Sequence, residues 1–341
     1  MPNLQTRSST RIGSWSGSRE GLLTTPAELV RGLARVNLPL YVVDHGDTFA
    51  FSHEGTVELG GDPQVEGLPL LALAPVCEPQ HLGSAGFAQD HGVRFCYLAG
   101  AMANGIGSVE LVEAMGRAGM LSFFGAAGLG PDPIEDAIDH ISTRLGDLPW
   151  GFNLIHSPYE PRLEEAVADL YVRRGVNRVS ASAYMDLTLP LVRYRLHGIH
   201  ADSSGRVVTP RRVVAKVSRT EVARKFFAPA PARMLAELVA SGDLTEDQAR
   251  MAETVPVAQD LTVEADSGGH TDNRPAITLL PTMLALRDRL QVKHDYDAPL
   301  RVGSAGGVST PHSVAATFAM GADYVLTGSV NQACVESGLD Q

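Results

Sequence analysis

From residue 97 onward, the chain alternates eight times between a short apolar run and an amphipathic stretch. In order, the runs are "FCYLAGAMANG", "MLSFFGAAG", "WGFNLIHS", "RVSASAY", "RVVAKVS", "LTVEADSGGH", "LRVGSAGGVS" and "DYVLTGSV". Stretches such as "PIEDAIDHISTRL" between them have the spacing of a helix with one apolar face. Strands that alternate with helices predict parallel βαβ units. Eight units predict an α/β fold of the (β/α)₈ TIM-barrel class.

Two further regions precede the expected barrel, which we assign to residues 97–341. Residues 1–37 begin with a polar stretch rich in Ser and Gly, so we expect a mobile leader. Residues 38–96 are expected to form a β-rich lead-in. Within it, residues 38–62 alternate between apolar and polar positions and turn like a small β-meander.

The connection between the fifth and sixth strands, at about 226–258, is too long for a plain crossover. It contains "PARMLAELVASG" and "TEDQARMAETV", which predict an inserted helical hairpin with Thr245 as an N-cap. We consider this hairpin a candidate lid over the barrel mouth. After the eighth strand the closing helix would be cut short, so either the barrel does without it or the chain is part of a longer protein.

Charge and composition exclude several classes. The net charge of −11 argues against nucleic-acid binding. No apolar run approaches the ~20 residues of a membrane span, and the N-terminus has no apolar signal segment. The three cysteines, Cys77, Cys96 and Cys334, give neither a disulfide framework nor the spacing of metal ligands. We therefore expect a cytoplasmic protein without a structural metal.

One segment is basic although the whole chain is acidic. Residues 171–225 hold 12 Lys and Arg against 3 Asp and Glu. This segment could attract an anionic ligand or an acidic partner. Equally, several of the arginines could stand at helix C-termini, where the helix dipole favours a cation.

In a (β/α)₈ barrel, the residues that follow each strand converge on one face, where the functional site is built. These positions hold mostly small residues, which leave room for a flat or bulky ligand. The strand-end residues that we assign to the site are Ala101, Met102, Ala103, Asn153, Ser182, Lys216, Glu264, Gly268, Gly269, Gly306, Gly307, Gly328 and Ser329.

Glycine-rich turns follow the last two strands, in "SAGGVST" and "LTGS". Such turns can present backbone N–H groups to a phosphate, and barrels recurrently bind phosphate after strands seven and eight. Tight turning alone would also explain the glycines. Together with the count of strands, the two turns predict a phosphate site at Gly306, Gly307, Gly328 and Ser329.

Two single residues could carry chemistry. Lys216 is a cation at the end of an apolar run, where it could meet a phosphate or the anion of a ring system; a surface lysine is the alternative. His270 follows Gly268 and Gly269, which let the backbone approach a ligand closely. An imidazole in that place can exchange a proton near neutral pH.

Three segments resemble the flavin-dependent enoyl reductases that act in trans in polyunsaturated-fatty-acid synthases and trans-acyltransferase polyketide pathways. The segments are "DHGVRFCYLAGAMANGIGSVELVEAMGRAGMLSFFGAAGL", "VEADSGGHTDNRP" and "GSAGGVSTPHSVAATFAMGADYVLTGSVNQACVESG". These reductases are a branch of the 2-nitropropane dioxygenase (nitronate monooxygenase) superfamily. The resemblance runs from about residue 39 to the end, and "EADSGGHTDNRP" is its most specific part.

The resemblance implies an FMN in the barrel mouth, with its phosphate on the two glycine turns. A single phosphate site favours FMN over FAD. Ala101, Met102, Asn153 and Lys216 would face the ring or the ribityl chain, and His270 matches the active-site histidine of the superfamily. NADPH would reduce the flavin, which then reduces an α,β-unsaturated acyl thioester.

The partners that this reading implies are an acyl carrier protein carrying the enoyl thioester and a polyketide or fatty acid synthase complex. A carrier protein is typically acidic, so the basic segment 171–225 is a candidate docking surface. A homodimer is a further possibility for the oligomeric state. Two alternatives also remain: an FMN- and O₂-dependent nitronate monooxygenase, and a catalytically silent flavin-binding partner of a synthase.

Overall fold

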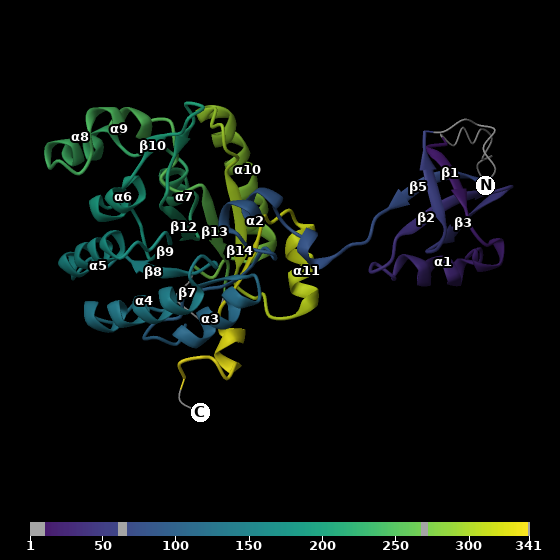
Figure 1. Ribbon diagram of the computed structural model, residues 1–341, viewed down its shortest axis with the longest axis horizontal. Coiled ribbons are helices and arrows are strands. Elements are labelled where there is room, and N and C mark those ends of the chain that lie inside the picture. Colours follow the sequence, from purple (N-terminus) through teal and green to yellow (C-terminus); the bar gives the residue numbers. More distant parts are fainter. Residues whose placement is uncertain (1–10, 61–66, 267–271, 340–341) are drawn as a thin grey trace. The chain divides into compact units, whose positions relative to one another are not determined.

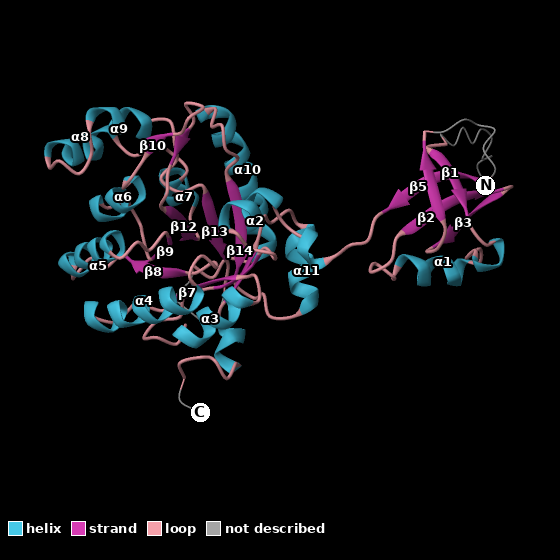
Figure 2. Cartoon of the chain, viewed as in Figure 1, coloured by secondary structure: helices cyan, strands magenta, loops and turns pink. Residues whose placement is uncertain are grey.

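A computed structural model describes residues 11–60, 67–266 and 272–339 (Figures 1 and 2). The chain divides into two compact units, Met1–His81 and Leu82–Gln341. Within the described ranges, no helix has both the length and the apolar character that crossing a membrane requires.

In its described residues, the N-terminal unit is an antiparallel sheet of five strands with one α-helix, α1 (Pro26–Leu33). Its strands stand in the order β3-β2-β5-β1-β4, with bounds β1 (Gly13–Ser16), β2 (Leu40–His45), β3 (Thr48–Ser52), β4 (Thr56–Leu59) and β5 (Leu68–Ala74). The buried side chains of Trp15, Val43, Ala50 and Leu70 form its core. α1 begins at a capping box, in which the Thr25 hydroxyl accepts from the N–H of Glu28 and the Glu28 carboxylate accepts from the N–H of Thr25.

Three of the expected boundaries differ from the structure. The described part of the expected leader, from residue 11 to 37, contains β1 and α1; its first ten residues lie outside the described ranges. The meander is also incomplete, because β2 and β3 pair as a hairpin but β4 pairs with β1 at the opposite edge. The lead-in ends early, since residues 82–96 belong to the barrel unit. The alternation of apolar and polar residues along a strand predicts which face of the strand is buried, but it does not predict which strand pairs with it.

The second unit is a closed barrel of eight parallel strands, which confirms the predicted fold. The strands follow one another in chain order, and β15 pairs with β6 to close the ring. Their bounds are β6 (Tyr97–Ala99), β7 (Leu121–Phe124), β8 (Gly151–Ile155), β9 (Arg178–Ser182), β12 (Arg212–Val217), β13 (Asp260–Glu264), β14 (Arg301–Ala305) and β15 (Val325–Thr327).

Helices surround the barrel (Figure 2). They are α2 (Ala85–His91), α3 (Val109–Arg117), α4 (Pro131–Leu145), α5 (Pro161–Arg173), α6 (Leu189–Leu196), α7 (Thr220–Phe226), α8 (Ala232–Ala240), α9 (Glu246–Ala252), α10 (Ala276–His294) and α11 (Pro311–Ala319). Several begin at a Ser or Thr whose hydroxyl accepts an N–H of the first turn: Ser84, Ser108, Thr188, Thr245 and Thr310. After β15, the described chain forms a short 3₁₀ helix, Ser329–Ala333.

The inserted helices α8 and α9 lie within the expected range, and Thr245 caps α9 as predicted. They do not form a lid over the mouth. The insertion follows α7 and precedes β13. It therefore lies at the face of the barrel where the strands begin, opposite the mouth. There Gln248 Nε2 donates to the carbonyl of Ile199, 3.2 Å away, just before the small hairpin β10 (His200–Ala201) and β11 (Val207–Val208). Figure 1 shows α8 and α9 at the outer edge of the barrel unit.

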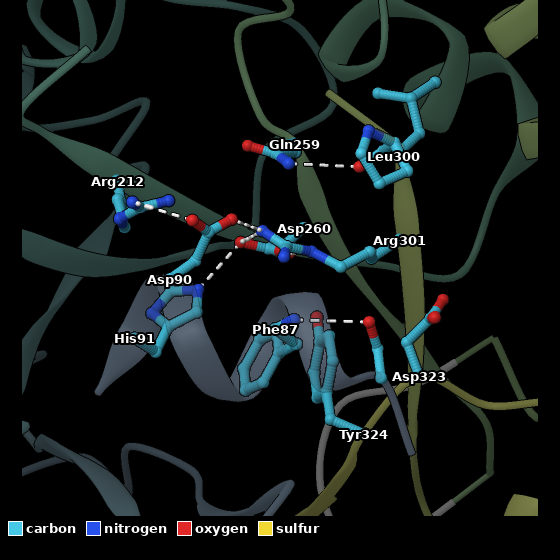
Figure 3. Close-up of polar contacts among 12 residues, drawn as sticks. Phe87, Asp90, His91, Arg212, Gln259, Asp260, Leu300, Arg301, Asp323 and Tyr324 are labelled. Atoms are coloured by element: carbon cyan, nitrogen blue, oxygen red, sulfur yellow. Dashed lines mark hydrogen bonds and ion pairs between the residues drawn. The ribbon is translucent and has the colours of Figure 1, made fainter. Parts of the chain in front are cut away.

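A buried polar network joins α2 to the N-terminal ends of the strands (Figure 3). Asp260 and Arg301 are the first residues of β13 and β14, and their side chains meet at 2.6 Å, between Asp260 Oδ1 and Arg301 Nε. His91, from α2, lies 2.8 Å from the other oxygen of Asp260 through its Nε2. Arg301 also contacts Asp90 at 2.8 Å. This is the face of a barrel where buried residues serve stability.

Candidate functional site

The C-terminal ends of β12 and β13 carry an ion pair. Lys216 Nζ lies 2.9 Å from Glu264 Oε1, and both side chains are partly buried. Lys216 is in register with Thr262, and because side chains alternate along a strand, Glu264 shares the face of Thr262. The sequence predicted both residues for the site, and the structure adds that they are partners of each other.

The turn after β14 requires glycine at Gly306, which has a φ of +90°. A Cβ there would lie 2.4 Å from the carbonyl oxygen of Ala265. At Gly307 and at Gly328, by contrast, a Cβ would meet no heavy atom of the described chain within 4 Å. The backbone at Gly307 and Gly328 therefore faces open space, which a side chain at either position would occupy.

That open space belongs to a cavity of about 290 Å³ at the mouth of the barrel. Seven of the predicted residues line it: Ala101, Lys216, Glu264, Gly306, Gly307, Gly328 and Ser329. They come from β6, β12, β13, β14 and β15 or from the turns that follow these strands. The structure thus brings both glycine turns and the ion pair to one place.

The other predicted residues lie elsewhere or outside the described ranges. Met102 is buried, and its backbone carbonyl accepts from the N–H of Gly107 at 3.0 Å. Ala103 is exposed in the turn after β6. Ser182 Oγ donates to Asn153 Oδ1 at 3.0 Å, and Asn153 lines a different cavity. Gly268, Gly269 and His270 lie outside the described residues, so their roles stay predictions.

A neighbouring cavity of about 310 Å³ shares Lys216 and Glu264 with the first one. Its wall includes Arg219 and Asp272, which form a two-pronged ion pair at 2.8 and 2.9 Å, and the Ser218 hydroxyl donates to Asp272 at 2.5 Å. Hydrogen bonds from Arg219 and Ser218 lower the pKa of Asp272 well below its usual range. The carboxylate therefore stays charged and fastens residue 272 to the end of β12.

Sequence reasoning missed several residues of the mouth. Asp266, Val308, Ser309, Leu326 and Val330 also line the first cavity. Each stands within two residues of a predicted position, so a wider window around the strand ends would have included them. Asp272 also stands two residues from the predicted His270, but its pairing with Arg219 joins positions 53 residues apart and left no signal in the sequence.

The residues at the mouth fit the phosphate end of a mononucleotide. Two turns with open backbone and the hydroxyl-bearing Ser329 supply the uncharged donors that such a group accepts from. The Lys216 ammonium adds a cation in the same cavity, with Glu264 beside it. A polar ligand with one phosphate is therefore compatible with this cavity.

Comparison with known proteins identifies relatives of the barrel. The chain is 46% identical over 264 residues to a component of the polyunsaturated fatty acid synthase of Thraustochytrium, covering 77% of this chain and 18% of that protein. It is 45% identical over 259 residues to the polyketide biosynthesis protein PksE of Bacillus subtilis, covering 76% of this chain and 34% of that protein. The chain therefore spans about a third or less of the length of these relatives. No protein-family model matches it.

A solved structure supports the same relationship. The enoyl reductase domain of MlnA, from the macrolactin biosynthesis cluster of Bacillus amyloliquefaciens, is 40% identical, with a TM-score of 0.75 over 77% of this chain and 60% of that one. FabK of Thermotoga maritima, at 21% identity and a TM-score of 0.51, shares the fold. Over about three quarters of its length, the chain is therefore similar to these synthase proteins and to the enoyl reductase domain of MlnA. The predicted resemblance is confirmed.

Proposed function

We propose that the protein is an FMN-dependent enoyl reductase that acts on carrier-bound enoyl thioesters in polyketide or polyunsaturated fatty acid synthesis. The observation that carries this proposal is the relationship to the enoyl reductase domain of MlnA. The cavity at the mouth supports it, because both predicted glycine turns and Lys216 line a single space.

In this proposal, Gly307, Gly328 and Ser329 would hold the phosphate of FMN through backbone N–H groups and a hydroxyl. Lys216 would lie beside the polar edge of the flavin, where an ammonium stabilises negative charge. Glu264 would orient that ammonium through the 2.9 Å contact between the two side chains. When bound, FMN would supply the hydride chemistry between NAD(P)H and the β-carbon of the enoyl thioester.

His270 would position or supply the proton that the α-carbon takes up. His270→Ala should retain FMN but lose about 10²–10⁴-fold in enoyl reduction, the usual effect of removing a positioned proton donor. The measurement is crotonyl-thioester reduction with FMN content recorded on the same sample. A parent rate in this variant would contradict the assigned role.

The relatives are synthase proteins, so a synthase complex and an acyl carrier protein are the proposed partners. The basic segment 171–225 stays a candidate docking surface for the carrier protein. Of its twelve cations, seven form ion pairs with Asp or Glu. Three more, Arg178, Arg195 and Arg211, donate to backbone carbonyls. Most of these cations therefore have a partner within the protein, and several of them, such as Arg206 and Lys225, are also exposed to solvent.

The test is an anaerobic titration followed by the visible spectrum. The protein is loaded with FMN, NADPH is added, and a crotonyl thioester follows. Bleaching by NADPH and recolouring by the thioester are the expected result. Failure to bind FMN would contradict the site, and O₂ consumption with a nitronate in place of enoyl reduction would identify a monooxygenase instead. Stable binding of a carrier protein without turnover would indicate a silent synthase partner.

A further inference from the structure

A separate cavity of about 450 Å³ lies at the C-terminal ends of β7 and β8. It is bordered by the connections that follow these two strands and by α5. None of the residues around the glycine turns takes part in it. Its volume falls in the range of small-molecule sites, and its place at the mouth end is where barrels bind ligands.

The wall of this cavity has an aliphatic part and a polar part, and the polar side chains are those of Asn153, Ser157, Glu160 and Glu164. The apolar side chains come from both connections, from β8 and from α5: Ala126, Leu129, Leu154, Ile155, Leu163 and Val167. Such a surface gains free energy by covering the hydrocarbon part of a ligand, because that removes apolar area from water.

The one buried carboxylate in the wall has its hydrogen bonds satisfied within the protein. Glu164 accepts from the Tyr184 hydroxyl at 3.0 Å and from the Thr188 hydroxyl, and its second oxygen lies 2.8 Å from His156 Nδ1. These partners stand after β8 and β9, so they fix the wall of the cavity. A carboxylate with these partners needs no cationic ligand. Glu160, the other carboxylate of the wall, is exposed at the start of α5, so the aliphatic side chains supply most of the buried part of the wall.

Asn153 connects this cavity to the strand ends. It lies on β8, in register with Ser180, and its side-chain oxygen accepts from Ser182. The sequence resemblance assigns Asn153 to the cofactor, and the structure places it in the wall of the aliphatic cavity. A ligand in the cavity would therefore have one end beside a predicted cofactor residue.

We propose that this cavity binds the acyl chain of the enoyl thioester and sets the chain length that the protein accepts. This proposal rests on the proposed function. An acyl chain fits because it is apolar along its length and polar only at the thioester end. The thioester would then lie toward Asn153, and the tail would lie among Leu129, Leu163 and Val167.

The first experiment fills the cavity from two sides. Leu163→Trp, from α5, and Leu129→Trp, from the connection after β7, are each compared with Ala166→Trp, an exposed position of α5. The substrates are the N-acetylcysteamine thioesters of crotonate and of dodec-2-enoate. We expect both filling variants to lose at least about tenfold in kcat/KM for the dodecenoyl substrate, through lost burial of methylenes, with crotonyl reduction kept within about twofold. Ala166→Trp should leave both substrates unchanged.

The second experiment does not depend on turnover. Leu163→Cys is made in a Cys77→Ser, Cys334→Ser background, which removes the two exposed native thiols. Alkylation of Cys at this position by N-ethylmaleimide is followed by mass spectrometry. Dodecanoyl-N-acetylcysteamine should slow it by at least about fivefold through burial of the chain, and butanoyl-N-acetylcysteamine should not.

The two experiments separate this proposal from the proposed function. Equal losses for both chain lengths in the Trp variants, or no protection by the dodecanoyl probe, would overturn the acyl-chain cavity. Protection without reduction of any thioester would support the cavity and contradict the reductase. Reduction of both thioesters, with no protection from alkylation and no change in chain-length preference, would support the reductase and contradict the cavity.

Discussion

The buried polar network at the N-terminal ends of the barrel strands gives a quantitative prediction about Asp260. Its carboxylate meets Arg301 at 2.6 Å and His91 at 2.8 Å, with the Asp260 side chain almost fully buried. Burial alone would raise the pKa of Asp260, but the charge of Arg301 and the contacts with His91 outweigh it and lower the pKa to about 2. Burial lowers the pKa of His91, so a neutral imidazole donates Nε2–H to the carboxylate.

Asp260→Asn replaces this acceptor with an amide that can offer only one oxygen. Breaking a buried charge pair by removing one partner costs about 3–5 kcal/mol. Arg301 keeps its 2.8 Å contact with Asp90, which is about one-third exposed, so the lower end is expected. The free energy of unfolding at neutral pH should therefore fall by about 3 kcal/mol.

The sign of the pH dependence follows from the lowered pKa. A carboxyl with a lower pKa in the folded state stabilises the fold above its unfolded pKa and loses that contribution as pH falls through the folded value. The ordinary pKa of 3.8 and the folded value of about 2 set the window. The difference corresponds to about 2 kcal/mol in total, of which about 1 kcal/mol is lost by pH 3.

The assay is urea unfolding at several pH values, followed by the fluorescence of Trp150. The sequence has two tryptophans, and Trp15 belongs to the N-terminal unit. A Trp15→Phe background therefore makes the signal specific for the barrel. Asp297→Asn, an exposed acid at the same end of the barrel, is the control, with an expected change within about 0.5 kcal/mol. A loss below about 1 kcal/mol in Asp260→Asn, or a gap to the parent that stays constant down to pH 3, would refute the reasoning.

Three further predictions concern the mouth and the insertion. Gly328→Ala should weaken FMN binding by about tenfold or more, because a methyl group would occupy the open face of the turn and displace a charge-assisted hydrogen bond of about 1.5–3 kcal/mol. Fluorescence titration of the apoprotein with FMN measures the Kd. An unchanged Kd would contradict the assignment of the phosphate to this turn. Lys216→Met should lower FMN retention on dialysis more than Glu264→Gln does, since only the first removes the cation; equal losses would argue against a role for the ammonium. Thr245→Ala should lower the free energy of unfolding in urea by about 1 kcal/mol, because the N-cap of α9 is lost. FMN binding should be unchanged, because α9 lies away from the mouth. An altered affinity for FMN would support the hypothesis that the insertion is a lid.

The local pattern of the sequence determined the barrel and much of its mouth. Eight short apolar runs predicted eight strands, and all eight form the ring in chain order. Parallel strands joined by helices place their C-terminal ends on one face. For that reason, Gly306, Gly307, Gly328 and Lys216 could be assigned to a common site before their positions were known.

Tertiary structure alone decided which of these residues are partners and what each end of the barrel contains. The contact between His91 and Asp260 joins positions 169 residues apart, and no periodic pattern encodes it. The pairing of β4 with β1 is equally invisible along the chain, because alternation fixes a strand's buried face and leaves its neighbour open. The aliphatic cavity beside Asn153 also arises only when two connections and α5 pack together. Periodicity is a property of neighbours in sequence, whereas ion pairs and cavities depend on distances in space between segments that folding brings together.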